Sequence, residues 1–176
     1  MYIFRGKAAT GKSTLANLLS KELSVAVICK DDVVDALKTT SDIDNNLLNN
    51  AICYNILQRI IQTNLDLGVD LILDVALGDR KNATWFFNRL DFKGNRVVKF
   101  FTVCSDDNEW QKRHFERISN PLPHQSFKSF EHVVEHYKSR DVNPFEDEHI
   151  VDTSNSIERC FGNIIETINA YKATSE

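Results

Sequence analysis

Short apolar runs alternate along the chain with longer segments in which apolar residues recur every three or four positions. The short runs are typical of buried strands, and the longer segments are typical of helices with one apolar face. Strands are expected at residues 2–4, 25–29, 71–75, 97–104 and 149–153. Helices are expected at residues 12–23, 33–38, 45–67, 82–90, 106–117, 127–138 and 157–171. This alternation predicts an α/β fold, in which a parallel sheet of about five strands forms the middle of three layers.

The segment from residue 118 to residue 125 interrupts the alternation, because Pro121 and Pro123 favour a loop there. No internal repeat, low-complexity run or linker divides the rest of the sequence. A chain of 176 residues, of which 42 % are hydrophobic, can build one core. We therefore expect a single domain that spans residues 1–176.

A phosphate-binding loop motif joins the first expected strand to the first expected helix. The sequence Gly-Lys-Ala-Ala-Thr-Gly-Lys-Ser occupies residues 6–13, with glycine at both positions where the chain must bend tightly around an anion. Lys12 would place its charge beside the β- and γ-phosphates of a nucleoside triphosphate, and Ser13 would reach a magnesium ion. The positive end of the helix that starts at Lys12 adds to this attraction. The motif predicts a site for ATP and Mg²⁺.

Acidic residues follow two of the expected strands. Asp31 and Asp32 come directly after residues 25–29, at a strand end that lies beside the γ-phosphate in P-loop proteins. A carboxylate there could accept the proton of an attacking hydroxyl, although both residues could instead cap the next helix. Asp74 ends the apolar run Leu-Ile-Leu-Asp, in the manner of the acid that orients magnesium or a water in its shell.

Two arginines stand four residues apart in the expected helix at residues 106–117. Arg113 and Arg117 therefore lie on one helix face. Guanidinium groups that close over the phosphates would stabilise the charge of phosphoryl transfer. The alternative is a solvated helix face, on which Arg113 pairs with Glu109 and Glu116.

Charge and cysteine content narrow the function classes further. The 21 basic and 25 acidic residues give a net charge of −4, whereas proteins that bind long polynucleotides usually carry a basic surplus. The four cysteines are widely spaced, which favours reduced thiols in a cytoplasmic protein over a disulfide scaffold. The first strand begins at once and leaves no room for a leader, and no apolar stretch approaches the roughly 20 residues of a membrane span. We therefore expect a soluble cytoplasmic protein without membrane contact.

Taken in order, the motifs resemble those of the small P-loop kinases related to the kinase domain of phage polynucleotide kinase, zeta toxins and chloramphenicol phosphotransferase. Residues 6–14 match the nucleotide loop, residues 29–33 match the segment with the general base, and residues 71–80 look like the third strand and the turn after it. Residues 112–117 resemble the lid helix, residues 134–138 the helix after the lid, and residues 151–154 the loop beside the adenine. The likeness covers most of the chain. It implies a P-loop sheet with a small helical lid at about residues 108–125.

The resemblance also implies an activity and a set of roles. It implies a kinase that transfers the γ-phosphoryl group of ATP to a hydroxyl of a small-molecule or nucleotide-type acceptor. Asp31 would be the general base, Arg117 and Arg113 would act as lid arginines, and Ser13 and Asp74 would serve the metal. The residues that would bind the nucleotide are Gly6, Ala8, Ala9, Thr10, Gly11, Lys12, Ser13, Thr14 and Thr153.

The acceptor itself is less clearly indicated. Its contacts would be Asp31, Asp32, Asp74 and Arg80. Polynucleotide kinases carry a basic residue three positions beyond the base, whereas this chain has Val34, which argues with the net charge against a nucleic-acid end. Two alternatives stay open: a P-loop ATPase or nucleotide switch that acts on a partner, and a kinase for nucleic-acid 5′-hydroxyl groups.

Overall fold

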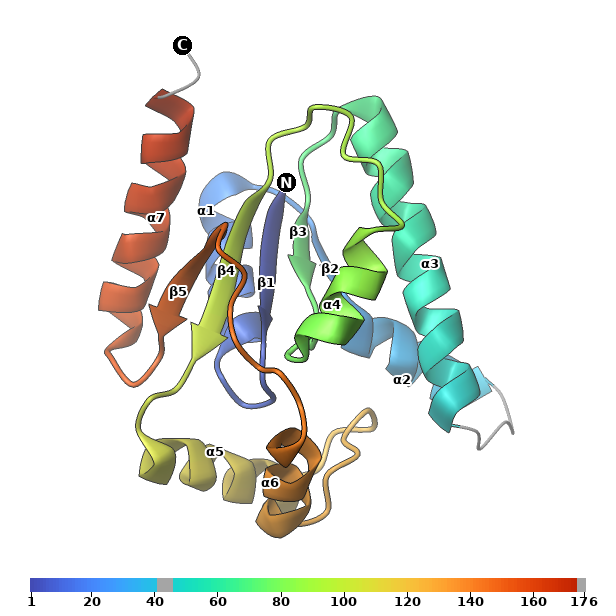
Figure 1. Ribbon diagram of the computed structural model, residues 1–176, viewed down its shortest axis with the longest axis vertical. Coiled ribbons are helices and arrows are strands. Elements are labelled where there is room, and N and C mark those ends of the chain that lie inside the picture. Colours follow the sequence, from blue (N-terminus) through green and yellow to red (C-terminus); the bar gives the residue numbers. More distant parts are fainter. Residues whose placement is uncertain (41–45, 174–176) are drawn as a thin grey trace.

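Five parallel strands form one sheet in the part of the chain that the computed structural model describes, residues 1–40 and 46–173 (Figure 1). The strands are β1 (Tyr2–Gly6), β2 (Val27–Cys29), β3 (Ile72–Asp74), β4 (Val98–Val103) and β5 (Glu148–Asp152). Their order across the sheet is β2-β3-β1-β4-β5, so that β1 lies in the middle. The expected α/β fold with a parallel sheet is confirmed.

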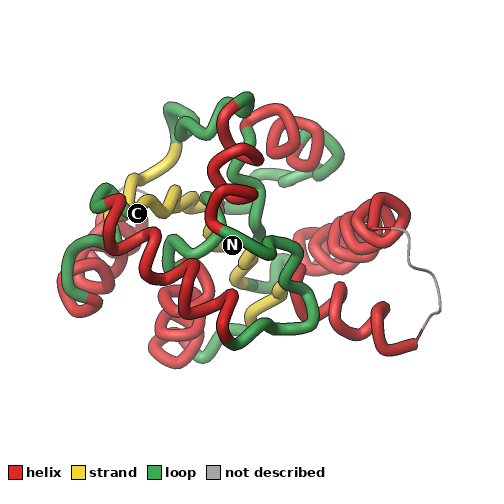
Figure 2. Tube along the Cα trace, turned by 90° about the horizontal axis from the view of Figure 1, so that it is seen from below, coloured by secondary structure: helices red, strands yellow, loops and turns green. Residues whose placement is uncertain are grey.

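Seven helices accompany the strands in the described residues. They are α1 (Lys12–Leu23), α2 (Lys30–Thr40), α3 (Asn46–Leu67), α4 (Arg80–Phe87), α5 (Asp107–Ser119), α6 (Phe130–Lys138) and α7 (Ile157–Ala173). Helices α1 and α7 cover one face of the sheet, and α3 and α4 cover the other, while α5 and α6 lie beyond the carboxyl ends of the strands (Figure 1). The view from below shows helices on both sides of the strands (Figure 2). Among the described residues, none of these helices is long and apolar enough to cross a membrane.

Helix α2 starts three residues earlier than expected. It begins at Lys30, directly after β2, so Asp31 and Asp32 lie inside its first turn rather than ahead of it. The expectation that both residues could cap the helix is therefore wrong. Negative side chains in a first turn are stabilised by the positive end of the helix dipole, and this explains why an acidic pair is tolerated there.

Two other helix starts are set by local caps. The side chain of Asp79 accepts a hydrogen bond from a backbone N–H of the first turn, so α4 begins at Arg80 and not at residue 82. Ser129 caps α6 in the same way, and that helix begins at Phe130 and not at residue 127. The expected start of the long helix at residue 45 lies outside the described residues.

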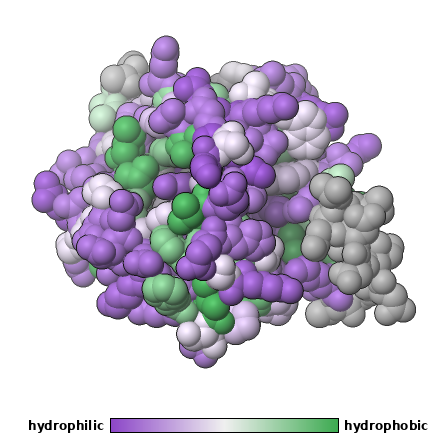
Figure 3. Space-filling model, turned by 60° about the horizontal axis from the view of Figure 1, so that its bottom comes forward, coloured by the Kyte–Doolittle hydropathy of each residue, from purple (hydrophilic) through white to green (hydrophobic). Residues whose placement is uncertain are grey.

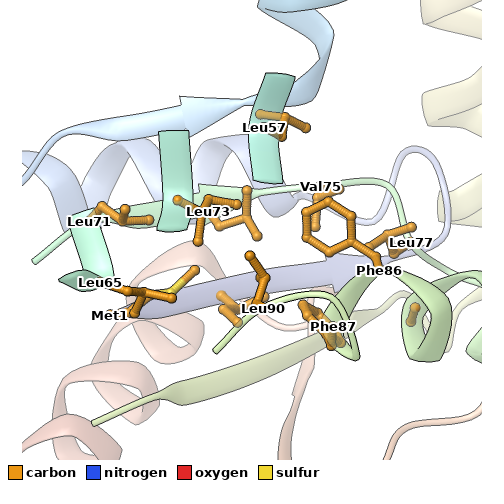
Figure 4. Packing of buried hydrophobic residues seen from close by; sticks show 13 residues of the cluster. Met1, Leu57, Leu65, Leu71, Leu73, Val75, Leu77, Phe86, Phe87 and Leu90 are labelled. Carbon is orange, nitrogen blue, oxygen red and sulfur yellow. The ribbon is translucent and has the colours of Figure 1, made fainter. Parts of the chain in front are cut away.

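Each face of the sheet has its own core, because alternate strand residues point to opposite faces. Ile3 and Leu73 belong to the cluster beneath α3 and α4, part of which is shown in Figure 4. Phe4 and Ile72 belong to the cluster beneath α1 and α7. All four side chains are fully buried. With both faces covered, the strands at the centre of the sheet are mostly apolar, which is why the sequence predicts them as apolar runs.

Candidate nucleotide and acceptor site

The loop between β1 and α1 has the tight backbone that its motif predicts. Gly6 has a φ of 149°, and a Cβ atom there would lie 2.3 Å from the carbonyl oxygen of Thr102 on β4. Gly11 has a φ of 80° at the N-cap of α1, where a Cβ atom would lie 3.2 Å from Cγ2 of Thr153. Both positions require glycine, the first for lack of space and the second chiefly for its backbone conformation.

Thr10 shapes this loop from inside. Its side chain is buried, and its hydroxyl donates to the carbonyl oxygen of Lys7 at 2.8 Å and lies 2.7 Å from the hydroxyl of Thr102. Neither Gly6 nor Thr10 lines either of the two cavities described below. Gly6 and Thr10, two of the residues expected to bind nucleotide, therefore maintain the shape of the loop.

Lys12 is the first residue of α1, and its side chain crosses the loop. Only 7 % of its surface is exposed, and its Nζ atom donates to the carbonyl oxygen of Lys7 at 2.7 Å. Burial lowers the pKa of Lys12, and the carboxylate of Asp74 opposes that shift. A cation in such a poorly solvated place interacts strongly with an incoming phosphate.

Asp74 stands at the end of β3 and meets Ser13 and Cys29. The Ser13 hydroxyl hydrogen-bonds to its carboxylate, and the Cys29 thiol donates to Oδ2 at 3.7 Å. Burial raises the pKa of Asp74, while Lys12 and the Ser13 hydroxyl oppose the rise. Burial and then the charge of Asp74 raise the pKa of the Cys29 thiol to about 12. Cys29 is therefore a protonated donor and not a nucleophile.

Ser13 and Asp74 fit a magnesium ion that is shared with a nucleotide. Mg²⁺ prefers hard oxygen ligands, and in NTPases it is held by one or two protein oxygens together with phosphates and water. The Ser13 hydroxyl lowers the pKa of the Asp74 carboxyl, burial raises it, and a cation beside the two would stabilise the charged form of Asp74.

Two cavities meet at the P-loop. The first, which we call the β5 cavity, has a volume of about 540 Å³ and is lined among others by Ala9, Gly11, Thr14, Arg113, Arg117 and Thr153. The second, which we call the α2 cavity, has a volume of about 410 Å³ and is lined among others by Lys12, Ser13, Asp31, Asp32, Asp74 and Arg117. Most of the predicted site residues are thus brought together at the carboxyl ends of the strands. The surface on this side of the molecule is mainly hydrophilic, with hydrophobic side chains in between (Figure 3).

The two arginines of α5 have different surroundings. Arg113 donates from Nε to Glu109 at 2.9 Å, from Nη1 to the hydroxyl of Thr153 at 2.8 Å and from Nη2 to the carbonyl oxygen of Thr153 at 2.7 Å. Arg117 is exposed and lines both cavities, and its charge helps to lower the pKa of Lys12. The expected pair of Arg113 with Glu109 exists, while no ion pair joins Arg113 to Glu116 in the described residues. Arg117 is therefore the arginine whose charge acts on Lys12.

Helices α5 and α6 hold the P-loop at Ala8, a contact that the sequence does not predict. Trp110 of α5 donates from Nε1 to the carbonyl oxygen of Ala8 at 2.9 Å, and the Ala8 N–H donates to the Tyr137 hydroxyl of α6 at 2.8 Å. The Nζ atom of Lys7 lies 4.3 Å from the centre of the Trp110 ring. The backbone N–H of Ala8, which was expected to contact phosphate, is thus engaged by Tyr137. The position of the loop depends on both helices.

Two residues singled out in the sequence lie away from the α2 cavity. The Arg80 guanidinium lies 3.5 Å from the Asp141 carboxylate and 4.8 Å from the centre of the Phe145 ring, and it lines neither cavity. Val34 is buried with 7 % of its surface exposed and likewise lines neither. Val34 itself therefore forms no part of either cavity wall.

The chain belongs to the AAA domain family, whose model matches residues 1–140. None of the curated proteins matches it significantly. Residues 1–140 include β1 to β4, the P-loop and both helices that hold it. The match therefore covers the P-loop and all the residues that line the α2 cavity.

Solved structures of kinases share the fold over nearly the whole chain. A candidate kinase from Chloroflexus aurantiacus is 18 % identical with a TM-score of 0.73, and covers 94 % of this chain and 96 % of its own. Shikimate kinase from Acinetobacter baumannii, in complex with shikimate, is 17 % identical with a TM-score of 0.68, covering 97 % and 93 %. The APS kinase of Mycobacterium tuberculosis, in complex with AMPPNP and APS, is 15 % identical with a TM-score of 0.63, covering 96 % of each chain. The protein thus has the nucleotide-binding P-loop fold, and its resemblance to small P-loop kinases is confirmed at the level of the fold.

Proposed function

We propose that the protein is a kinase that uses ATP and Mg²⁺ to phosphorylate a hydroxyl group of a small-molecule or nucleotide-type acceptor. The observation that carries this proposal is the pair of cavities that meet beside Lys12 and Arg117. A switch or simple ATPase needs one cavity, for its nucleotide. A kinase needs a second one on the far side of the transferring phosphate, with a proton acceptor in its wall, and Asp31 lies in the wall of the α2 cavity.

In this proposal the nucleotide occupies the β5 cavity and the P-loop. The base and ribose lie near Thr153 and Thr14, and the phosphates reach along the loop to Lys12 at the border of the two cavities. Mg²⁺, when bound by Ser13 and Asp74, neutralises charge on the phosphate oxygens. Arg113 borders the same cavity, and it would have to leave Thr153 in order to reach the phosphates.

The chemical step requires a base on the acceptor side and positive charge over the moving group. The acceptor oxygen forms its bond to the γ-phosphorus as the bond to ADP breaks, and the hydroxyl proton passes to the Asp31 carboxylate. Lys12 and Arg117 stabilise the charge that spreads over the equatorial oxygens. Asp32, which is more exposed than Asp31, would contact the acceptor.

A small acceptor remains our proposal for reasons of charge and space. The net charge is −4, and a cavity of about 410 Å³ lies in the size range of small-molecule sites. Two kinases with this fold were solved with small molecules, shikimate and APS. The uncharged Val34, three residues beyond Asp31, also offers no cation to a phosphate of a nucleic-acid acceptor.

The test is a screen for ATP-dependent phosphorylation of nucleosides, sugars, nucleotide sugars, antibiotics and oligonucleotide 5′ ends. Asp31→Asn should lower turnover of the best acceptor by roughly 10²-fold or more with little change in ATP affinity, as loss of a general base predicts. Asp32→Asn is the matched control, because it removes the neighbouring charge from the same turn of α2 and should have a smaller effect.

Two outcomes would replace the proposal. ATP hydrolysis that a partner stimulates, with no hydroxyl acceptor in any class, would indicate a nucleotide switch. Efficient labelling of oligonucleotide ends, with apparent affinity that falls about a hundredfold between roughly 50 and 200 mM salt, would indicate a nucleic-acid kinase that binds several phosphates.

A further inference from the structure

The loop between α5 and α6 is fastened to one face of α2. Nδ1 of His124 lies 2.9 Å from Oδ2 of Asp35, and Nε2 lies 3.5 Å from Oδ2 of Asp31. One turn further along, Nζ of Lys38 donates to the carbonyl oxygen of Pro123 at 2.9 Å. Residues three and four positions apart share a helix face, so α2 makes all these contacts from one side. The loop thereby covers the α2 cavity, and His124 is part of its lining.

His124 stands between two carboxylates, and one of them is the proposed general base. A carboxylate only accepts, so a ring that holds both Asp35 and Asp31 carries a proton on each nitrogen, and the shorter bond, from Nδ1 to Asp35, fixes the plane of the ring. The second nitrogen is thereby aimed at Oδ2 of Asp31. Among the described residues, the ion-pair contact of the Asp31 side chain is the one with Nε2 of His124. Because this contact uses Oδ2 of Asp31, Oδ1 of the same carboxylate is left for a ligand in the α2 cavity.

We propose that His124 is a positioning residue, which orients Asp31 for proton abstraction while the loop covers the α2 cavity. This inference rests on the proposed function. By holding one carboxylate oxygen, the ring turns the other toward the acceptor hydroxyl, and a catalytic group displaced by about 1 Å can lose a large part of its effect. Asp35 holds the ring, whereas Lys38 holds the loop without touching Asp31. The base is therefore aligned when the loop is closed, which favours the acceptor over water as the attacking group.

The two ring nitrogens can be tested separately. In His124→Asn the amide nitrogen takes about the place of Nδ1 and can keep the contact with Asp35, but nothing reaches Asp31. In His124→Gln the longer amide can reach Asp31 and gives up Asp35. With the best acceptor from the screen, kcat should fall about tenfold in His124→Asn and recover for the most part in His124→Gln, with an unchanged KM for ATP.

Lys38→Met is the matched control, because it removes the other tether of the same loop and leaves the contacts of His124 in place. Its KM for the acceptor should rise, and its kcat should stay within about twofold of the wild type. If Lys38→Met lowers kcat as much as His124→Asn does, or if the asparagine and glutamine variants are equally impaired, His124 only tethers the loop and the proposal is overturned.

A second measurement needs no acceptor. In ¹⁵N NMR spectra of the histidine rings, the Nε2 signal of His124 should move in Asp31→Asn and stay in place in Asp32→Asn. If the Nε2 signal of His124 does not move in Asp31→Asn, the positioning role of His124 is overturned, while the kinase proposal is unaffected. A wild-type enzyme that phosphorylates no acceptor overturns the proposed function and the role of His124 in transfer, and the NMR result then reports only on the contact itself.

Discussion

The fully buried ion pair between Arg5 and Glu148 gives the sharpest prediction about stability. Both side chains have 0 % exposure, and the two groups share two hydrogen bonds, one of them between Arg5 Nη2 and Glu148 Oε2 at 2.7 Å. The Arg5 guanidinium also donates to the carbonyl oxygens of Leu77 at 2.8 Å and Asn143 at 3.0 Å. The pair therefore joins β1, just before the P-loop, to β5 and to two loops.

The perturbation is Glu148→Gln, which keeps the shape and removes the charge. Removing one partner of a buried pair costs about 3–5 kcal/mol, because the other charge is left in the interior. We expect about 3 kcal/mol, the lower end of that range, because Arg5 keeps its carbonyl acceptors. It also keeps the rings of Phe101 and Phe145, whose centres lie 4.4 and 4.5 Å away. For a chain of this size, that loss corresponds to a decrease of roughly 6–12 °C in Tm.

The assay is urea and thermal unfolding followed by circular dichroism, with Asp147→Asn as the matched control. Asp147 is the next residue in the chain and pairs with Lys99 at 2.6 Å, but 60 % of its side chain is exposed. Its loss should cost at most about 1 kcal/mol. The double variant Arg5→Met/Glu148→Leu should recover much of the stability, since no buried charge remains. If Glu148→Gln is no less stable than the Asp147→Asn control, the argument from burial is refuted.

Three further predictions concern the site and its surroundings. Lys12→Ala should retain less than about a tenth of the wild-type turnover, since a large electrostatic stabilisation is lost. The measurement is a single-turnover assay. A rate above about a tenth of the wild-type rate would show that Lys12 does not act on the phosphates. Arg117→Ala should slow the chemical step at nearly constant ATP affinity. Arg113→Ala should instead weaken ATP binding, measured by calorimetry, because Arg113 holds the wall of the β5 cavity. Equal effects of the two substitutions on rate and on binding would contradict this division. Burial, followed by the charge of Arg117, lowers the pKa of His114 in the folded protein to about 4. As the pH falls, His114 therefore takes up its proton in the unfolded chain before it does so in the folded protein. Stability should decrease as the pH falls from 6.5 toward 4. Urea denaturation at pH 7 and 4.5 should show a smaller loss for His114→Phe than for the wild type, by about 2–3 kcal/mol, and equal losses would contradict the burial of a neutral ring.

The sheet could be predicted from the sequence because most strand residues are apolar on both sides, and that pattern follows from helices that cover both faces. The P-loop could be predicted because all its requirements lie within residues 6–13. Strand and helix ends were less certain, since they depend on single contacts. The Asp79 and Ser129 caps show this, because each moves a helix start by two or three residues.

Contacts between distant parts of the chain could not be predicted in the same way. The bond from Ala8 to Tyr137 spans 129 positions, and that from His124 to Asp35 spans 89. Tyr137 looks like any aromatic residue of an amphipathic helix, and His124 looks like any polar residue of a proline-containing loop. Neither has a local signal, because its function depends on what the fold places opposite it.

The arginines of α5 show where spacing stops being informative. A separation of four residues correctly predicts that Arg113 and Arg117 share a helix face, but it says nothing of what lies opposite each one. The residue opposite Arg113 is Thr153, which follows β5 and offers a hydroxyl and a carbonyl oxygen that suit the guanidinium fork. The neighbour of Arg117 is Lys12, a second cation, so Arg117 has no such partner there and an anion between the two would stabilise both. In our proposal, α5 thus uses one arginine to hold the wall of the β5 cavity and presents the other to a phosphate. This division follows from the position of β5 beside β4, which only the folded sheet supplies.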